Sequence, residues 1–202
     1  MIPTISAACT SGLAVIPTAD VVGAKQFSIE LQLDGTTNPL AADCKVFNAE
    51  FGIGDRLEVG VDTDLAEATE DRFFFNGKYV LGKSIDGKLA VAFGVCGFTP
   101  TGHFDSNPYV VATRDFARFR ITAGASYLSR RTEAVIGVDE PLNEHVTLML
   151  DHTTGPNNYS SGALNYQVSD HVGIMAGVLI PNSSSNDTRF SIHFVFGGAL
   201  GK

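Results

Sequence analysis

The amino-acid sequence predicts an all-β fold in which about twelve antiparallel strands run up and down and close into a barrel. Three observations support this prediction. Apolar and polar residues alternate with a period of two from Gln26 onward, turn-forming residues separate the alternating runs, and no helical pattern interrupts them. Strict alternation is typical of strands with one apolar face, because successive side chains of a strand point to opposite sides of the sheet.

The alternating runs can be followed along the chain. Residues 27–33 (FSIELQL) place four apolar side chains on one face and three polar side chains on the other, and residues 47–53 and 57–62 repeat this arrangement. Residues 189–196 (RFSIHFVF) show the same pattern near the end of the chain. The strands predicted by this criterion are 26–34, 44–53, 56–64, 71–82, 88–98, 107–115, 117–129, 132–140, 145–152, 159–168, 171–180 and 187–198.

The connections between the predicted strands alternate in length. Short turns are expected at 54–55, 84–87, 115–117, 141–144 and 169–170, and longer polar loops at 35–43, 65–70, 100–105, 153–158 and 181–186. Alternate turns of an up-and-down barrel gather at one end, and membrane barrels have short turns at one end and longer loops at the other. The connection at Arg130-Arg131 departs from this pattern, because it should be a long loop and is short.

Residues 1–25 form a separate region, and residues 26–202 form the predicted barrel. The segment 11–20 (SGLAVIPTAD) contains glycine and proline, is mostly apolar and lacks the strand alternation. Two interpretations stay open. The region is either an extended lead-in to the first strand or a plug that lies inside the barrel.

The content of the two faces indicates which one points outward. A soluble barrel has its apolar face inside, whereas a membrane barrel inverts this. Here the apolar face is almost uninterrupted, and the other face mixes charged residues with glycine and alanine, which suits the limited space of a lumen. The chain has no run of 18 apolar residues, so a transmembrane helix is not expected. The sequence therefore predicts a transmembrane β-barrel. Tyr79, Tyr109, Tyr127 and Tyr166 either form interfacial girdles or take part in ordinary sheet packing.

Several functional classes fit poorly. A formal net charge of -8 without a basic run argues against binding to nucleic acid. The three cysteines, Cys9, Cys44 and Cys96, lack metal-ligand spacing, and their odd number leaves at least one free. No metal and no cofactor are expected. A barrel lipase would need a Ser–His pair on the lipid side; His152 has that parity, but no outward serine is expected beside it, so no enzyme is predicted.

The inward-facing ionisable residues are the candidate functional residues, as the lining of a pore. If an acidic wall faces a basic wall across the lumen, the resulting field favours polar solutes. In the alternative interpretation, these residues pair with one another and seal the interior as a salt-bridged core. The acidic wall comprises Glu30, Glu50, Glu58 and Asp62, the basic wall comprises Arg72, Lys78, Arg114, Arg118 and Arg120, and Asp139, Asp151, Arg189 and His193 complete the set.

The alternating pattern of residues 26–198 resembles the porin-like outer-membrane barrels of diderm bacteria. Residues 12–20 are also similar to the lead-in of barrel proteins of the YjbH type, which are associated with exopolysaccharide export. These resemblances imply a protein of the bacterial outer membrane that contacts lipid and passes ions or small polar solutes. The alternative they imply is a barrel that does not transport solutes and instead anchors an envelope or export complex. Such a barrel could be an oligomer or a member of that complex. A soluble carbohydrate-binding β-sandwich is a further alternative, and the resemblances imply no catalytic residue.

Overall fold

The computed structural model describes residues 11–65, 73–99 and 106–200. Cys9 and Arg72 lie outside these ranges. The strands are β1 (Gln26–Thr37), β2 (Leu40–Ile53), β3 (Leu57–Asp64), β4 (Phe73–Lys83), β5 (Leu89–Phe98), β6 (Asn107–Asp115), β7 (Arg120–Leu128), β8 (Arg131–Pro141), β9 (Val146–Thr153), β10 (Tyr159–Ser169), β11 (Val172–Pro181) and β12 (Arg189–Ala199).

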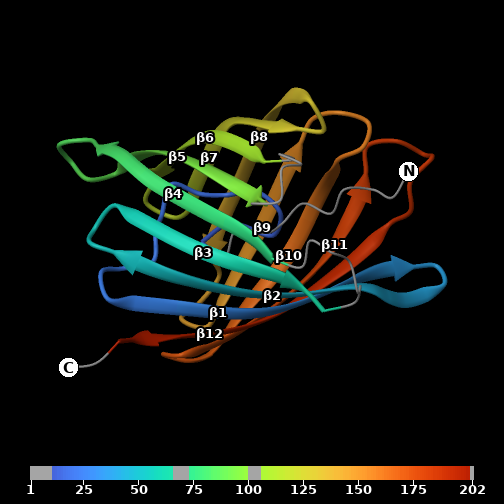
Figure 1. Cartoon of the computed structure of the whole chain (residues 1–202), viewed down its shortest axis with the longest axis horizontal. Coiled ribbons are helices and arrows are strands. Elements are labelled where there is room, and N and C mark those ends of the chain that lie inside the picture. Colours follow the sequence, from blue (N-terminus) through green and yellow to red (C-terminus); the bar gives the residue numbers. More distant parts are fainter. Residues whose placement is uncertain (1–10, 66–72, 100–105, 201–202) are drawn as a thin grey trace.

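The twelve strands form one closed barrel in which each strand pairs with its neighbours in the sequence (Figure 1). The ring closes where β1 pairs antiparallel with β12, from Gln26 opposite Ala199 to Thr36 opposite Arg189. The predicted up-and-down barrel is therefore confirmed, and the β-sandwich alternative is wrong because there is a single closed sheet. Closure leaves no strand edge unpaired. A sheet in a medium without water needs this, because nothing else there can hydrogen-bond the backbone groups of a free edge.

Two connections differ from their predicted form. Residues 35–43 were expected to form a long loop, but β1 and β2 continue through most of this stretch to a tight turn at Asn38-Pro39. The polar residues of this stretch still pair across β1 and β2, and the register between the two strands shifts between Asp34 and Gly35. The connection between β7 and β8 is a two-residue turn at Ser129-Arg130, both with positive φ. This is the backbone of a type I′ hairpin, whose twist matches that of the strands, so the short connection does not interrupt the sheet.

The turns define two ends of the barrel. Residues 54–56, 84–88, 116–119, 142–145 and 170–171 connect strands at one end, here named the short-turn end. The turns after β2 and β4 lie at the left of Figure 1, and the turn after β1 lies at the right, at the opposite end. Residues 11–25 reach β1 at the short-turn end, where Lys25 N–H donates to the carbonyl oxygen of Gly52. No helix among the described residues is long and apolar enough to cross a membrane.

The barrel is apolar outside and carries ionisable side chains inside. Phe75, Leu164 and Phe194 are 44%, 50% and 44% exposed on the outer face, whereas Glu50 and Lys78 are 0% and 1% exposed. A water-soluble protein would show the reverse distribution, because exposed apolar surface is costly in water and buried charge is costly everywhere. This distribution is that of a barrel that spans a membrane.

One of the four expected interfacial tyrosines points the other way. Tyr79, Tyr127 and Tyr166 are between 44% and 50% exposed on the outer face, whereas Tyr109 is 4% exposed. Tyr109 lies in the buried apolar cluster inside the barrel. The prediction for Tyr109 is wrong, because its parity on β6 matches that of the inward residue Val111.

Candidate functional site in the barrel lumen

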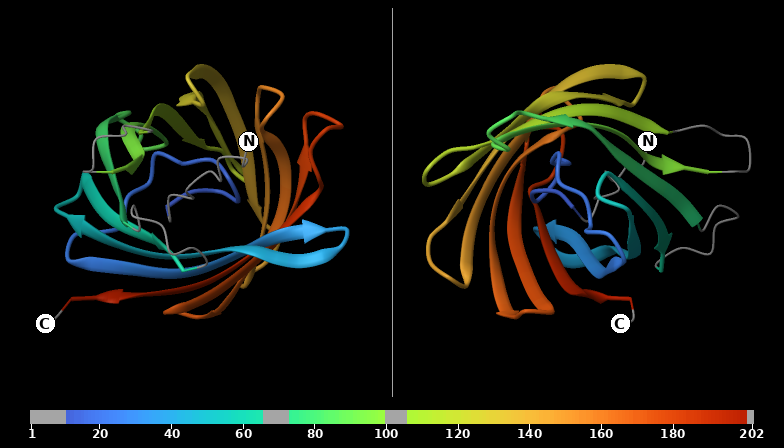
Figure 2. Two further views of the ribbon diagram at one scale, coloured as in Figure 1. Left: turned by 45° about the vertical axis from the view of Figure 1, so that its right-hand side comes forward. Right: turned by 90° about the vertical axis from the view of Figure 1, so that its left-hand side faces the viewer.

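Residues 11–25, here named the luminal segment, lie inside the ring of strands, where Figure 2 shows them in blue. The segment folds into a small hairpin, in which Leu13 N–H donates to Ile16 O at 2.8 Å and a bridge joins Gly12 to Pro17. Leu13 and Ile16 are buried against apolar residues of the barrel wall. The apolar core of this molecule is thus built between the luminal segment and the inner face of the strands.

Glu58 on β3 and Lys78 on β4, which lie opposite each other in the sheet, bind the luminal segment. Both oxygens of the Glu58 carboxylate accept from Ser11 Oγ at 2.7 Å, and one also accepts from Val22 N–H at 2.7 Å. Lys78 Nζ donates to the backbone oxygens of Ser11 (2.7 Å) and Asp20 (2.8 Å), and also to Ser11 Oγ. Lys78 Nζ lies 3.5 Å from Glu58 Oε1. The two side chains form the Glu58–Lys78 latch.

Three further wall residues hold the segment on the other side of the lumen. Asp151 on β9 accepts from Val15 N–H at 3.0 Å, and Thr113 Oγ1 on β6 accepts from Ala19 N–H at 2.9 Å. Arg120 on β7 donates to Asp20 at 2.8 Å and to Asp139 of the neighbouring strand at 2.9 Å. Because these three residues lie on β6, β7 and β9, the luminal segment is fixed to the wall on both sides.

Two glycines let the segment lie against the wall. A Cβ at Gly52 would lie 2.0 Å from Gly23 O and 2.3 Å from Val22 O. A Cβ at Gly137 would lie 2.4 Å from the side chain of Leu13. Any larger residue at Gly52 would collide with backbone, which cannot move aside as a flexible side chain can. The small inward residues of the wall are therefore used in part to seat the luminal segment.

A buried hydrogen-bonded network joins β1 to β12. His193 Nδ1 lies 2.9 Å from Glu30 Oε1, and His193 Nε2 lies 2.7 Å from Ser191 Oγ. Ser191 in turn donates to Asp34 at 2.5 Å. His193 therefore links Glu30 on β1 to Asp34 on the same strand through Ser191 on β12. The four side chains, named the β1–β12 network, are all at most 5% exposed.

Most of the predicted inward residues lie inside the barrel. Buried there are Glu30, Glu50, Glu58, Asp62, Lys78, Asp139, Asp151 and His193. Arg120 is half-buried, and Arg189 lies at the rim opposite the short-turn end, where it pairs with Asp43.

Two predicted members of the basic wall are misplaced. Arg114 is exposed, has the parity opposite to the inward residue Thr113, and stacks over the ring of Phe116 at 5.6 Å. Arg118 is exposed in the turn between β6 and β7, outside any strand. Arg72 lies outside the described residues. The predicted arrangement of an acidic wall opposite a basic wall is therefore wrong. The two inward cations of that set, Lys78 and Arg120, each pair with an acid on the adjacent strand.

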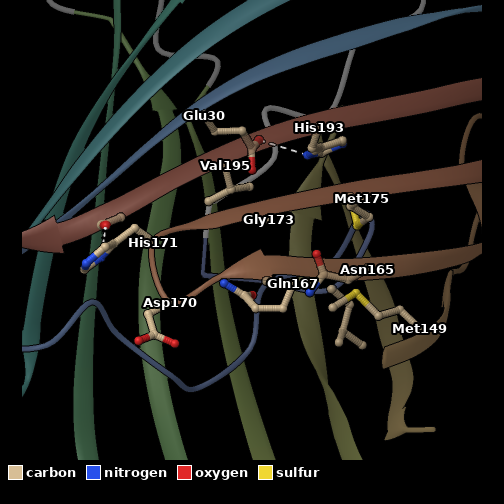
Figure 3. Close-up of a pocket in the computed structure, with 13 residues that line it drawn as sticks. Glu30, Met149, Asn165, Gln167, Asp170, His171, Gly173, Met175, His193 and Val195 are labelled. Carbon is tan, nitrogen blue, oxygen red and sulfur yellow. Dashed lines mark hydrogen bonds and ion pairs between the residues drawn. The ribbon is translucent and has the colours of Figure 1, made fainter. Parts of the chain in front are cut away.

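A cavity of about 310 Å³ remains between the luminal segment and the wall formed by β9 to β12 and β1. Its inner part is lined by Glu30 and His193, and Asp170 and His171 of the β10–β11 turn lie at its edge (Figure 3). Both turn residues are exposed, so the cavity opens at the short-turn end. The sequence pattern does not reveal this cavity, because its shape depends on where the luminal segment lies.

A Ser–His pair lies on the outer face, where none was expected. His152 on β9 pairs with Ser160 on β10, and His152 Nδ1 lies 2.8 Å from Ser160 Oγ. The prediction that no outward serine would lie beside His152 is wrong, because the strand register brings the two residues opposite each other. Among the described residues, no carboxylate or amide is hydrogen-bonded to the other ring nitrogen of His152. The pair satisfies two polar side chains that face an apolar medium.

The cysteines differ in state. Cys44 on β2 is a free thiol, 1% exposed, and Cys96 on β5 is disulfide-bonded. Within the ranges that the structure describes, no group of three or more His, Cys, Asp or Glu side chains is arranged to hold a metal ion.

Comparisons with known proteins give structural neighbours only. No family model matches the sequence, and no curated protein matches it. The KdgM porin, solved alone and in complex with disordered oligogalacturonate, superposes with a TM-score of 0.58 and 10% sequence identity. In both cases the superposition covers 84% of this chain and 98% of the porin chain.

An active-site variant of outer membrane phospholipase A from Escherichia coli superposes with a TM-score of 0.48 and 10% identity, over 92% of this chain and 94% of the phospholipase chain. A likeness of that degree supports no statement about activity. The KdgM superposition, together with the closed ring of twelve antiparallel strands and its apolar exterior, shows that this chain has the fold of porin-like outer-membrane β-barrels.

Proposed function

We propose that the chain is a bacterial outer-membrane channel for ions or small polar solutes, and that the luminal segment closes it in the state described here. The KdgM-like fold and the apolar exterior support a place in the outer membrane, with lipid around the barrel. The lumen, in contrast to the exterior, is lined by ionisable side chains. Such a lining favours the passage of polar solutes over that of apolar solutes.

One observation carries the proposal. The charged groups of the wall bind the luminal segment instead of only sealing the interior against one another: Glu58, Lys78 and Asp151 are all hydrogen-bonded to its backbone. The backbone hydrogen bonds that join the described residues of the segment to the barrel are made by Gly23 and Lys25, outside residues 11–22. Movement of residues 11–22 would therefore leave the twelve-strand ring intact and expose a charged passage.

The second candidate function is a sealed barrel that anchors or assembles an envelope complex. It is favoured by the apolar contacts of Leu13 and Ile16, which pack into the interior as a core would. The two candidates make opposite predictions for a barrel without the segment, since a channel then conducts and a sealed barrel stays closed or unfolds.

The test is conductance in planar bilayers of the wild type and of a variant lacking residues 11–22. Recordings include a reductant, because Cys96 is disulfide-bonded. We expect rare, small current steps for the wild type and frequent ohmic steps for the deletion variant. Heat-modifiable gel migration establishes that the variant is a closed barrel. A folded deletion variant that carries no current would contradict the channel and favour the sealed barrel.

We also propose that the chain has no enzymatic role. Nucleophilic catalysis by serine needs a base that is held by a third group and a site that stabilises the oxyanion. The outward pair of Ser160 and His152 supplies only a serine and a base. Its hydrogen bond has the simpler function of pairing two polar groups at the lipid boundary.

A further inference from the structure

We infer that the cavity at the short-turn end is a binding site for a small solute that carries a cationic amino group. This inference rests on the proposed function in one respect, namely that a channel would carry the class of solute that its cavity binds. The binding itself requires no conduction, because the cavity is present while the luminal segment lies inside the barrel.

The position and size of the cavity suit a small ligand. It lies between the luminal segment and β10–β12, and its edge is formed by the exposed turn residues Asp170 and His171 (Figure 3). A volume of about 310 Å³ is at the low end of the range of roughly 300–1,000 Å³ that ligand pockets occupy. A solute of monosaccharide size matches it.

The polar groups of the lining are mostly hydrogen-bond acceptors. Asn165 Oδ1 and Gln167 Oε1 both lie 3.6 Å from the position that a Cβ of Gly173 would take, so both amide oxygens face the same part of the wall. The Gln167 amide nitrogen is already used, since it donates to Ser169 O and Val172 O. The oxygen of this amide is therefore the atom left for a ligand.

The ionisable residues of the lining are carboxylic acids and histidines. Glu30 and Asp170 line the cavity, and no lysine or arginine does. The two lining histidines already have partners: His171 Nδ1 lies 3.1 Å from Gly197 O, and His193 Nδ1 lies 2.9 Å from Glu30. An ammonium group is a donor with a positive charge, so it complements both the acceptors and the carboxylates.

The surrounding lumen reinforces this preference. In the part of the chain that the structure describes, the inward carboxylates outnumber the inward lysine and arginine residues. An excess of one sign in a confined space raises the local concentration of the opposite ion. The inward acids are Glu30, Asp34, Glu50, Glu58, Asp62, Asp139 and Asp151, and the inward bases are Lys78, Arg120 and the rim residue Arg189.

The test compares three sugars that differ in charge: glucosamine, glucose and glucuronate. Equilibrium binding to the full-length protein in detergent is measured by saturation-transfer NMR titration. We expect glucosamine to bind most tightly and glucuronate least. The variant Asp170→Asn should weaken glucosamine binding about fivefold to tenfold, the scale of one partly exposed charge-assisted hydrogen bond, and change glucose binding less than twofold.

The matched control is Asp55→Asn, which removes an exposed carboxylate from another turn at the same end of the barrel and should change neither affinity. Three results would overturn the inference: no binding of any of the three sugars, equal or tighter binding of glucose or glucuronate, or an unchanged glucosamine affinity in Asp170→Asn. If the protein binds these sugars selectively by charge but never conducts, the proposed channel function is refuted and the proposed binding site stands. Conduction without this selectivity would refute the site alone.

Discussion

Replacing Lys78 by methionine is expected to loosen the luminal segment, raise conductance and lower the free energy of unfolding of the barrel by about 3–5 kcal/mol. Lys78 is 1% exposed and supplies three hydrogen bonds to the segment. Methionine preserves the length of the side chain and removes the charge. The carboxylate of Glu58 then stays buried without the cation beside it, which is the costly half of a broken ion pair.

The measurement combines single-channel recording with urea unfolding followed by heat-modifiable gel migration. In the double variant Glu58→Gln/Lys78→Met no uncompensated charge remains, so we expect most of the barrel stability to return while the segment stays loose and conductance stays high. The control Lys88→Met removes a lysine from the exposed β4–β5 turn and should change neither property. Wild-type conductance and stability in Lys78→Met would show that the latch does not hold the segment.

The second large effect is expected from His193→Phe, which keeps a ring of similar size and removes both ring nitrogens. His193 bridges Glu30 directly and Asp34 through Ser191, and all four side chains are buried. Without it, two carboxylates remain in a low-dielectric interior with fewer hydrogen bonds. Loss of one partner from such a buried network costs about 3–5 kcal/mol of unfolding free energy.

This effect is measured as a shift of the urea midpoint. His145→Phe is the matched control, because His145 is an exposed histidine in the β8–β9 turn, and its midpoint should change little. Adding Glu30→Gln to His193→Phe removes one of the stranded charges and should recover part of the loss. Equal midpoints for the His193 and His145 variants would mean that the β1–β12 network contributes nothing to stability.

The strand pattern was predictable from the sequence because the alternation of apolar and polar residues reports directly which face each side chain occupies. Glu58 and Phe194 show this well. Within its own strand, Glu58 alternates with apolar residues and Phe194 alternates with mostly polar or small residues, so the pattern places them on opposite faces of the sheet, as observed. The closed ring follows from the same pattern, because lipid cannot pair the edges of an open sheet.

The errors have three causes. Arg114 lies within β6, where the alternation holds, and it was assigned to the wrong face together with Tyr109 because the parity of this strand was inverted. Arg118 lies beyond the end of β6, in a turn where no alternation determines direction. The contact between Ser160 and His152 depends on the register of β9 against β10, which the intervening turn sets and parity does not.

The latch and the cavity could not be predicted at all, because they depend on residues 11–25 meeting strands far away in the sequence. Ser11 and Glu58, for example, are 47 residues apart in the chain. No periodic pattern in the sequence reports a contact between an irregular segment and a strand. The plug was therefore one of two open interpretations, and its partners Thr113 and Asp151 were not assigned to it.

The orientation of the two faces is the claim on which the account depends, and tryptophan fluorescence in vesicles of brominated lipid tests it most directly. The chain contains no tryptophan, so a single introduced indole is the only one observed. Phe194 and Val195 are neighbours on β12 with opposite parity; Phe194 is 44% exposed outside, and Val195 lines the cavity. We predict strong quenching by brominated acyl chains in Phe194→Trp and little in Val195→Trp. Quenching of Val195→Trp with Phe194→Trp unaffected would contradict the membrane-spanning barrel.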